Sequence, residues 1–171
     1  MANTYVAIAT VTVGSGGAAD IEFTSIPQTY TDLLLVISGR KTTSGVTDLG
    51  LRINSLTTGY NFRSIGSNGS TVTNGNFTNF SYYYQEDALQ GSDSTASTFS
   101  SSQVYIPNYT SSNNKVFSGD AVTENNATTA YTRMSAADIS TSSAISSILI
   151  KPGTGNWAQY STATLYGIKN T

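Results

Sequence analysis

The sequence predicts an all-β protein, a jelly-roll-like antiparallel β-sandwich formed as a single domain over residues 1–171. Three observations lead to this prediction. Apolar and polar residues alternate in short segments with Gly, Pro, Asn and Ser turns between them, and no convincing helical period is present. The composition favours Ser, Thr, Asn and Gly over helix formers. We expect about nine or ten strands, which suits a jelly roll better than a seven-stranded immunoglobulin domain.

The longest apolar run, at residues 33–37, belongs to a strand around which the rest of the chain is organised. Alternation divides its side chains between two faces, with Leu33, Leu35 and Ile37 on one and Leu34 and Val36 on the other. Pro27 sets the corner before the run, because it cannot donate to a ladder and it holds Ile26 extended. A strand that is apolar on both faces must be covered on both, by a second sheet on one side and by a loop or subunit on the other.

Four further strands alternate in the first half of the chain, at residues 3–13, 20–23, 49–53 and 60–65. Gly14-Ser15-Gly16-Gly17 follows the first of them. No Lys-Ser/Thr follows these glycines and no helix begins there, so we expect a hairpin and not a phosphate loop. Residues 66–75 read as a loop region, with a short ribbon as the alternative, because Asn68-Gly69 and Asn74-Gly75 favour positive φ and tight reversals.

The second half begins with an aromatic cluster, at Phe77, Phe80, Tyr82, Tyr83 and Tyr84. A polar loop is expected at residues 85–96. Strand-like alternation then returns at residues 98–106, 115–122, 128–137, 144–151 and 160–169. Residues 135–143 are the one segment compatible with a helical turn.

The composition excludes several classes of chemistry. The chain contains no Cys, which removes disulfides and thiolate sites, and no His, which removes Ser-His-Asp triads, His-ligated zinc and histidine pH switches. No catalytic carboxylate pair with a defined separation is identifiable either. We therefore expect no enzyme, no cofactor and no metal site.

The charge pattern bears on partners. Charged residues make up 11% of the chain, with 8 basic and 10 acidic side chains scattered singly, so no basic stripe exists to follow a phosphate backbone. We expect no binding to nucleic acid. No apolar stretch has the length needed to span a bilayer, and the N-terminus lacks the pattern of a secretory signal. We expect a chain that is made in a cytoplasm and does not interact with membranes.

Three motifs carry a resemblance to a known family: FTSIPQTYTDL at residues 23–33, NNAT at residues 125–128 and AQYSTATLYGIK at residues 158–169. With the opening strand and its glycine-rich turn, the chain resembles small virion structural proteins of tailed bacteriophages, particularly phages of aquatic bacteria. The resemblance spans nearly the whole chain, but its motifs carry no chemistry. Members are described as structural, head-decoration or tail-fibre-like proteins. No separate attachment domain, fibrous repeat or coiled-coil stem is visible, which favours a compact head-surface protein.

The expected function is therefore that of a capsid decoration or cement protein that binds the assembled head and stabilises it. The resemblance implies a place in the virion, the major capsid protein as partner and self-association, most simply as a homotrimer. The alternative is a tail-associated module that recognises the host by binding glycan.

The aromatic residues are the candidate contact residues. Aromatic side chains are enriched at protein interfaces and charges are depleted there, which fits a chain so poor in charge. The same rings could instead fill the core or stack against sugars. The candidate interface residues are Phe77, Phe80, Tyr82, Tyr83, Tyr84, Tyr109 and Trp157.

Other polar residues have ordinary explanations. Glu86, Asp87 and Asp93 fall in the predicted polar loop, where solvated acids are favoured over a calcium site because their spacing matches no EF-hand. Asn-X-Ser/Thr triplets are common in any chain rich in Asn and Thr. Isolated arginines read as paired surface charges or contacts with a capsid neighbour; they are Arg40, Arg52, Arg63 and Arg133.

Overall fold

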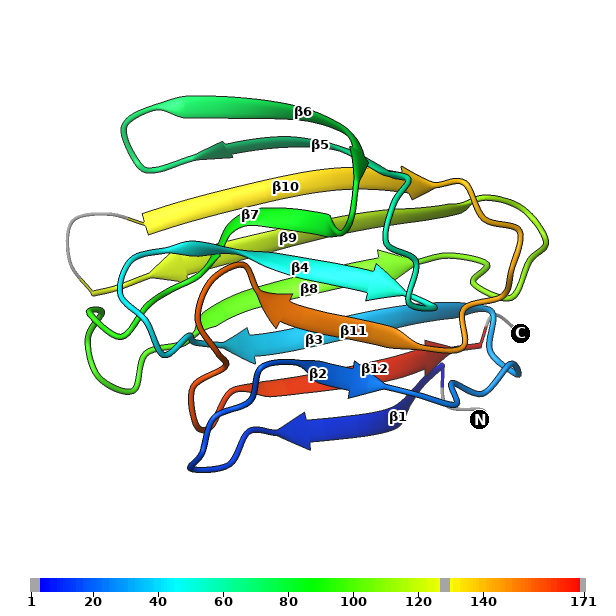
Figure 1. The fold of residues 1–171 in the computed structure, drawn as a ribbon, viewed down its shortest axis with the longest axis horizontal. Helices are drawn as coiled ribbons and strands as arrows, with labels where there is room; N and C mark the ends of the chain where they lie inside the picture. Colours follow the sequence, from blue (N-terminus) through cyan, green and yellow to red (C-terminus); the bar gives the residue numbers. More distant parts are fainter. Residues whose placement is uncertain (1–3, 127–129, 170–171) are drawn as a thin grey trace.

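The computed structural model describes residues 4–126 and 130–169, and it contains twelve strands and no helix in these residues (Figure 1). These residues therefore contain no helix that could cross a membrane. The named strands pair only in antiparallel fashion, which confirms the predicted all-β sandwich. The predicted strand starts at Asn3 and Thr128 lie outside the described residues. The strands are β1 (Tyr5–Thr12), β2 (Ile21–Phe23), β3 (Asp32–Gly39), β4 (Thr47–Ile53), β5 (Tyr60–Ser67), β6 (Val72–Phe80), β7 (Tyr83–Leu89), β8 (Ser100–Ile106), β9 (Lys115–Glu124), β10 (Ala130–Ile139), β11 (Ile148–Pro152) and β12 (Thr162–Ile168).

The two sheets differ in size. The large sheet has eight strands in the order β1-β12-β3-β8-β9-β10-β5-β6, and the small sheet has four in the order β2-β11-β4-β7. In Figure 1 the small sheet lies in front of the large one, while β5 and β6 extend beyond β7 at the top of the view. The finer assignment as a jelly roll stays a prediction, because a simple jelly roll divides eight strands between its sheets.

The core lies between the two sheets and follows the alternation of β3. Leu33, Leu35 and Ile37 are at most 1% exposed and face the small sheet. They are joined there by the inner side chains of β4 and β11, among them Leu51 and Ile150. β3 lies in the middle of the large sheet between β12 and β8, so the prediction of a central strand is confirmed.

The other side of β3 has no layer over it. Leu34 is half-buried and Val36 is 39% exposed. The small sheet covers one side of the large sheet, and no described segment packs on the opposite side. The second cover that the sequence requires for this strand is therefore not supplied by the described part of the chain.

Three segments differ from the prediction. Residues 66–75 hold the end of β5, the turn at Asn68-Gly69 and the start of β6, so Asn74-Gly75 lies within a strand and not in a reversal. Residues 85–89 belong to β7 and not to a loop, because Gln85 enters the core and donates its Nε2 to the carbonyls of Gln103 and Asp120. Residues 135–139 continue β10, which pairs with neighbours on both sides, so no helical turn forms there.

Loops at the ends of the sandwich are held by two cations, the half-buried Arg40 and the buried Lys115. Arg40 donates to the carbonyl oxygens of residues 92, 94, 95 and 98 at 2.7–3.2 Å. Lys115 is 1% exposed and donates to the carbonyls of Ser111 and Thr141. Burial lowers the pKa of Lys115. Both side chains satisfy backbone acceptors that would otherwise lack partners away from water.

Candidate functional site

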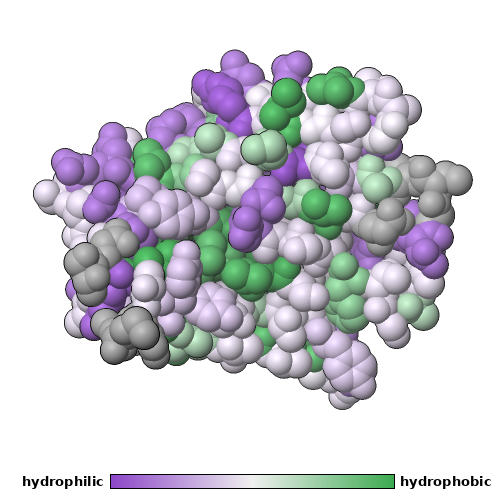
Figure 2. Space-filling view, turned by 180° about the vertical axis from the view of Figure 1, so that it is seen from behind, coloured by the Kyte–Doolittle hydropathy of each residue, from purple (hydrophilic) through white to green (hydrophobic). Residues whose placement is uncertain are grey.

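We use the name outer face for the side of the large sheet that points away from the small sheet. Ten large apolar or aromatic side chains are exposed in the described chain, and all but Phe80 and Tyr160 lie on this face. Figure 2 shows the outer face, with apolar residues running across its middle and hydrophilic residues mostly toward its margins. The eight residues are Tyr5, Val36, Ile65, Val72, Tyr105, Val116, Val122 and Met134.

The strand register arranges these side chains in rows that cross the sheet. One row, on β3, β8, β9, β10 and β5, consists of Leu34, Tyr105, Ser118, Ala136 and Arg63. The next row on the same strands consists of Val36, Gln103, Asp120, Met134 and Ile65. Directly opposed side chains on one face of an antiparallel pair lie within contact distance. The two rows therefore form a continuous surface.

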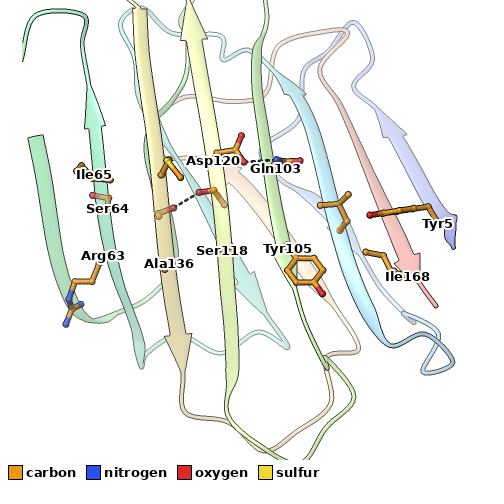
Figure 3. Close-up of a pocket in the computed structure, with 14 residues that line it drawn as sticks. Tyr5, Arg63, Ser64, Ile65, Gln103, Tyr105, Ser118, Asp120, Ala136 and Ile168 are labelled. Carbon is orange, nitrogen blue, oxygen red and sulfur yellow. Dashed lines mark hydrogen bonds between the residues drawn. The ribbon is translucent and has the colours of Figure 1, made fainter. Parts of the chain in front are cut away.

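A shallow groove of about 710 Å³ follows these rows. In Figure 3, which looks onto the sheet, the ring of Tyr105 is seen face-on, so the ring lies along the sheet surface. Its hydroxyl donates to Oδ2 of Asp32 at 2.8 Å, and Oδ1 of Asp32 accepts from the backbone N–H of Asn108 at 2.8 Å. The hydrogen bond to the Asp32 carboxylate raises the pKa of Tyr105. These bonds fix the orientation of the ring.

The two rows carry few charged side chains, and their net charge is zero. Their only charged side chains are Arg63 and Asp120. Asp120 Oδ1 accepts a hydrogen bond from Nε2 of Gln103 at 2.7 Å (Figure 3). Arg63 Nη1 donates to the carbonyls of Phe62 and Phe77. The surface is therefore suited to a neutral partner and carries no strong field of either sign.

The predicted contact residues fall into two groups. Tyr83, Tyr109 and Trp157 are 0% exposed, so their side chains belong to the core, and we do not propose them as contact residues. Each has a polar atom satisfied inside: Trp157 Nε1 donates to the Ile150 carbonyl at 3.3 Å, for example. The other four gather at the edge of the sandwich where β5 and β6 extend beyond β7: Phe77, Phe80, Tyr82 and Tyr84.

We use the name aromatic edge for Phe77, Phe80, Tyr82 and Tyr84 together with Phe62, which lies at their centre. Phe62 and Phe77 stack with ring centroids 4.4 Å apart, and Phe80 meets both rings edge-on at 5.5 and 5.4 Å. Tyr84 lies 6.3 Å from Phe80 and 5.6 Å from Tyr82. Such edge-on and stacked geometries are favourable for aromatic pairs, so the cluster stabilises the β5–β6 hairpin against β7.

The predicted acidic loop residues do not converge. Glu86 and Asp87 lie on β7, where Asp87 forms an ion pair with Arg133. Asp93 lies in the following loop and accepts a hydrogen bond from the Gly45 N–H at 2.8 Å. In residues 4–126 and 130–169, no group of three or more acidic side chains is placed to hold a metal ion.

Tyr105, Gln103, Asp120 and Met134 are the functional candidates that the sequence analysis missed. The signal for two of them is present in the sequence, because Gln103 and Tyr105 alternate with the buried Val104. Their grouping with Asp120 and Met134 depends on pairing between strands, which alternation does not give.

Comparison of the chain with protein-family models, with curated proteins and with solved structures finds no match.

Proposed function

We propose that this protein is a virion structural protein of a tailed bacteriophage, a decoration protein whose outer face docks on the assembled capsid. The observation that carries this proposal is the concentration of eight of the ten exposed large apolar side chains on the outer face. The largest apolar patch on a monomeric protein is usually small, so a larger one marks an interaction surface. The resemblance of the three sequence motifs supplies the partner, the major capsid protein.

The size of the outer face fits a stable protein contact. Eight strands spaced at about 4.8 Å give a width of about 38 Å, and a seven-residue strand such as β8 is about 24 Å long. The product, roughly 900 Å², is close to the ~800 Å² that each partner buries in a standard interface. Low charge on the rows agrees with the depletion of charged residues at interface cores.

The proposed mechanism needs no catalysis. A protein that binds the assembled shell and not its free subunits stabilises the shell by its binding free energy, in proportion to the number of copies bound. Self-association into trimers would let one particle make several such contacts, which raises the effective concentration of each.

Two measurements test the proposal. Cryo-EM of the virion should find many copies of the chain on the head shell, with the outer face against the capsid protein or a neighbouring copy. A few copies at the tail would contradict it. In binding assays with assembled shells, Val122→Glu and Met134→Glu should each weaken binding at least about tenfold, because an unpaired carboxylate would be buried. Tyr160→Glu is the control, because Tyr160 is as exposed as Met134 (67%) but lies away from the outer face.

A second candidate function is glycan recognition in the groove, at the tail. The observation that favours it is the flat ring of Tyr105 beside the hydrogen-bonded pair Gln103 and Asp120 (Figure 3). Sugars stack their apolar faces on such rings and bond their hydroxyls to amide and carboxylate groups. Glycan-array binding that is lost in Tyr105→Ala, together with few copies per virion, would favour this function over capsid decoration.

A further inference from the structure

A second cavity, of about 350 Å³, lies at the aromatic edge and away from the outer face. It opens between the β5–β6 hairpin and the solvent side of β4 and β7. Tyr84 and Glu86 point to this side because they alternate with the buried Tyr83 and Gln85. The cavity is lined by Thr47, Asp48, Phe62, Phe77, Phe80, Tyr84, Glu86, Gly153 and Thr154.

Aromatic rings form much of the wall. Phe62, Phe77 and Phe80 meet within 5.5 Å of one another, and Tyr84 completes the group. The neighbouring ring of Tyr82 already carries a cation, because the Arg52 guanidinium lies 3.8 Å from its centroid. Aromatic faces attract cations through the ring quadrupole. The chain therefore already contains one cation–π contact of the kind that the cavity can offer to a ligand.

The polar part of the lining is acidic. Asp48 and Glu86 are the only charged side chains that line the cavity. Glu86 uses Oε2 to accept from the Ser64 hydroxyl, and Asp48 uses Oδ1 to accept from the Asp87 N–H at 3.1 Å. The second oxygen of each carboxylate makes no hydrogen bond within the described chain. Two acceptors with negative charge are thus available beside the rings.

No cationic side chain of the described chain lies in the lining beside this pair. Arg133 is paired with Asp87, and both Arg52 and Lys151 lie over Tyr82, outside the lining. Lys41 donates its Nζ to Oγ1 of Thr154 at 3.0 Å, on the far wall. Burial, with the charges of Asp87 and Glu86, raises the pKa of Asp48, although the Asp87 N–H and Arg133 act in the opposite direction. A cation entering the cavity would relieve this unfavourable environment.

We propose that the aromatic edge cavity binds an alkylammonium group, with the rings around its carbon atoms and Asp48 and Glu86 beside its charge. A neutral apolar ligand would leave the second oxygen of each carboxylate without a partner, and an anion would be repelled by both groups. The same chemistry is present in a lysine side chain of a partner protein and in a small quaternary ammonium compound. The site goes beyond the proposed docking function and does not depend on it.

The direct test is NMR titration of the full chain with choline and with its neutral isostere, in which a tert-butyl group replaces the trimethylammonium. We expect choline to shift the signals of Phe80 and Tyr84 and the isostere to bind at least about threefold more weakly, the low end of a cation–π contact. Nα-acetyl-lysine amide presents the primary ammonium of a lysine side chain, and its Nε-trimethylated form presents a quaternary ammonium. Comparison of the two shows which kind of ammonium group is the better occupant. Tighter binding of either one supports the proposal.

Two variants locate the site. Glu86→Gln keeps the size of the side chain and the contact with Ser64 but removes a charge, and Phe80→Leu removes a half-exposed ring. Each should weaken choline binding roughly threefold to tenfold. Tyr160→Leu, an aromatic change at an exposed side chain outside both the cavity and the outer face, should leave it unchanged. Equal binding of choline and its isostere, an unchanged affinity in Glu86→Gln, or no shift at the cavity residues would each overturn the proposal.

Discussion

Trp157 provides the sharpest test of how the fold is stabilised, because the sequence alone placed this residue among the candidate contacts. It is the only tryptophan of the chain, and its side chain is 0% exposed. Its backbone N–H donates to the Ala18 carbonyl at 2.7 Å, and Ala18 N–H donates back at 3.2 Å. The indole lies between β11 and β3, because Nε1 bonds to the Ile150 carbonyl and the ring approaches Gly39. We predict that Trp157→Ala destabilises the fold and does not act on partner binding directly.

The expected magnitude follows from the burial. Truncating a fully buried tryptophan to alanine costs about 3–5 kcal/mol, from lost transfer free energy and the cavity left behind. The hydrogen bond from Nε1 to the Ile150 carbonyl is lost as well, which adds to the cost. Domains are stable by about 5–15 kcal/mol in total, so the variant should remain folded but lose a large share of its stability. With a urea m-value of about 2.5 kcal/mol/M, the midpoint should fall by about 1–2 M.

The assay is urea denaturation followed by far-UV circular dichroism, since the variant lacks the fluorophore. In the native chain, the emission of Trp157 should shift to the red in the same transition that the dichroism reports. Tyr160→Ala, an aromatic truncation three positions away at a side chain that is 67% exposed, is the matched control and should change stability by less than about 0.5 kcal/mol. An unchanged midpoint in Trp157→Ala, combined with lost binding to shells, would refute the core assignment.

Three further predictions concern packing and pH. Gly39→Ala should destabilise by about 1–3 kcal/mol in the same urea assay, because its Cβ would lie 2.7 Å from Cζ3 of the Trp157 ring. Burial raises the pKa of Asp48, so at pH values just above the ordinary aspartate pKa the folded chain binds more protons than the unfolded chain. The unfolding free energy should therefore fall as pH rises through that window. Asp48→Asn should remove this part of the pH dependence. Burial also raises the pKa values of Tyr60 and Tyr83 to about 12. The unfolding free energy should therefore fall as pH rises from about 10 to about 12, because only the unfolded chain ionises these rings in that range. Phenolate absorbance should show the two rings ionising only at the upper end of this range or when the chain unfolds.

Local alternation predicted much of the fold because it reports which side chains share a face. The run at residues 33–37 alternates, and β3 buries the same three side chains that the alternation assigns to one face. The aromatic cluster carried a similar signal that was not used. In Tyr82-Tyr83-Tyr84 the middle ring is buried and the outer two are partly exposed, as a period of two requires.

Long-range pairing set the limit of prediction. Gln85 looked like a loop residue by type, yet it is 1% exposed because carbonyls from two distant strands accept its amide hydrogens. Likewise, Val36 and Met134 appear unrelated along the chain, and only the order of β3, β8, β9 and β10 places them on one surface. Both the outer face and the aromatic edge cavity arise from neighbours that are separated by tens of residues.

The place of β12 in the large sheet affects when the protein can fold. β12 lies between β1 and β3, so the strand synthesised last of those described must insert between two made much earlier. Until it emerges from the ribosome, β1 has no pairing partner and one edge of β3 stays open. Closing such distant pairs costs loop entropy before any contact repays it, so we expect slow folding of the large sheet. The outer face would therefore become complete only after β12 has been made, so earlier-made strands cannot present the finished surface to a partner on their own.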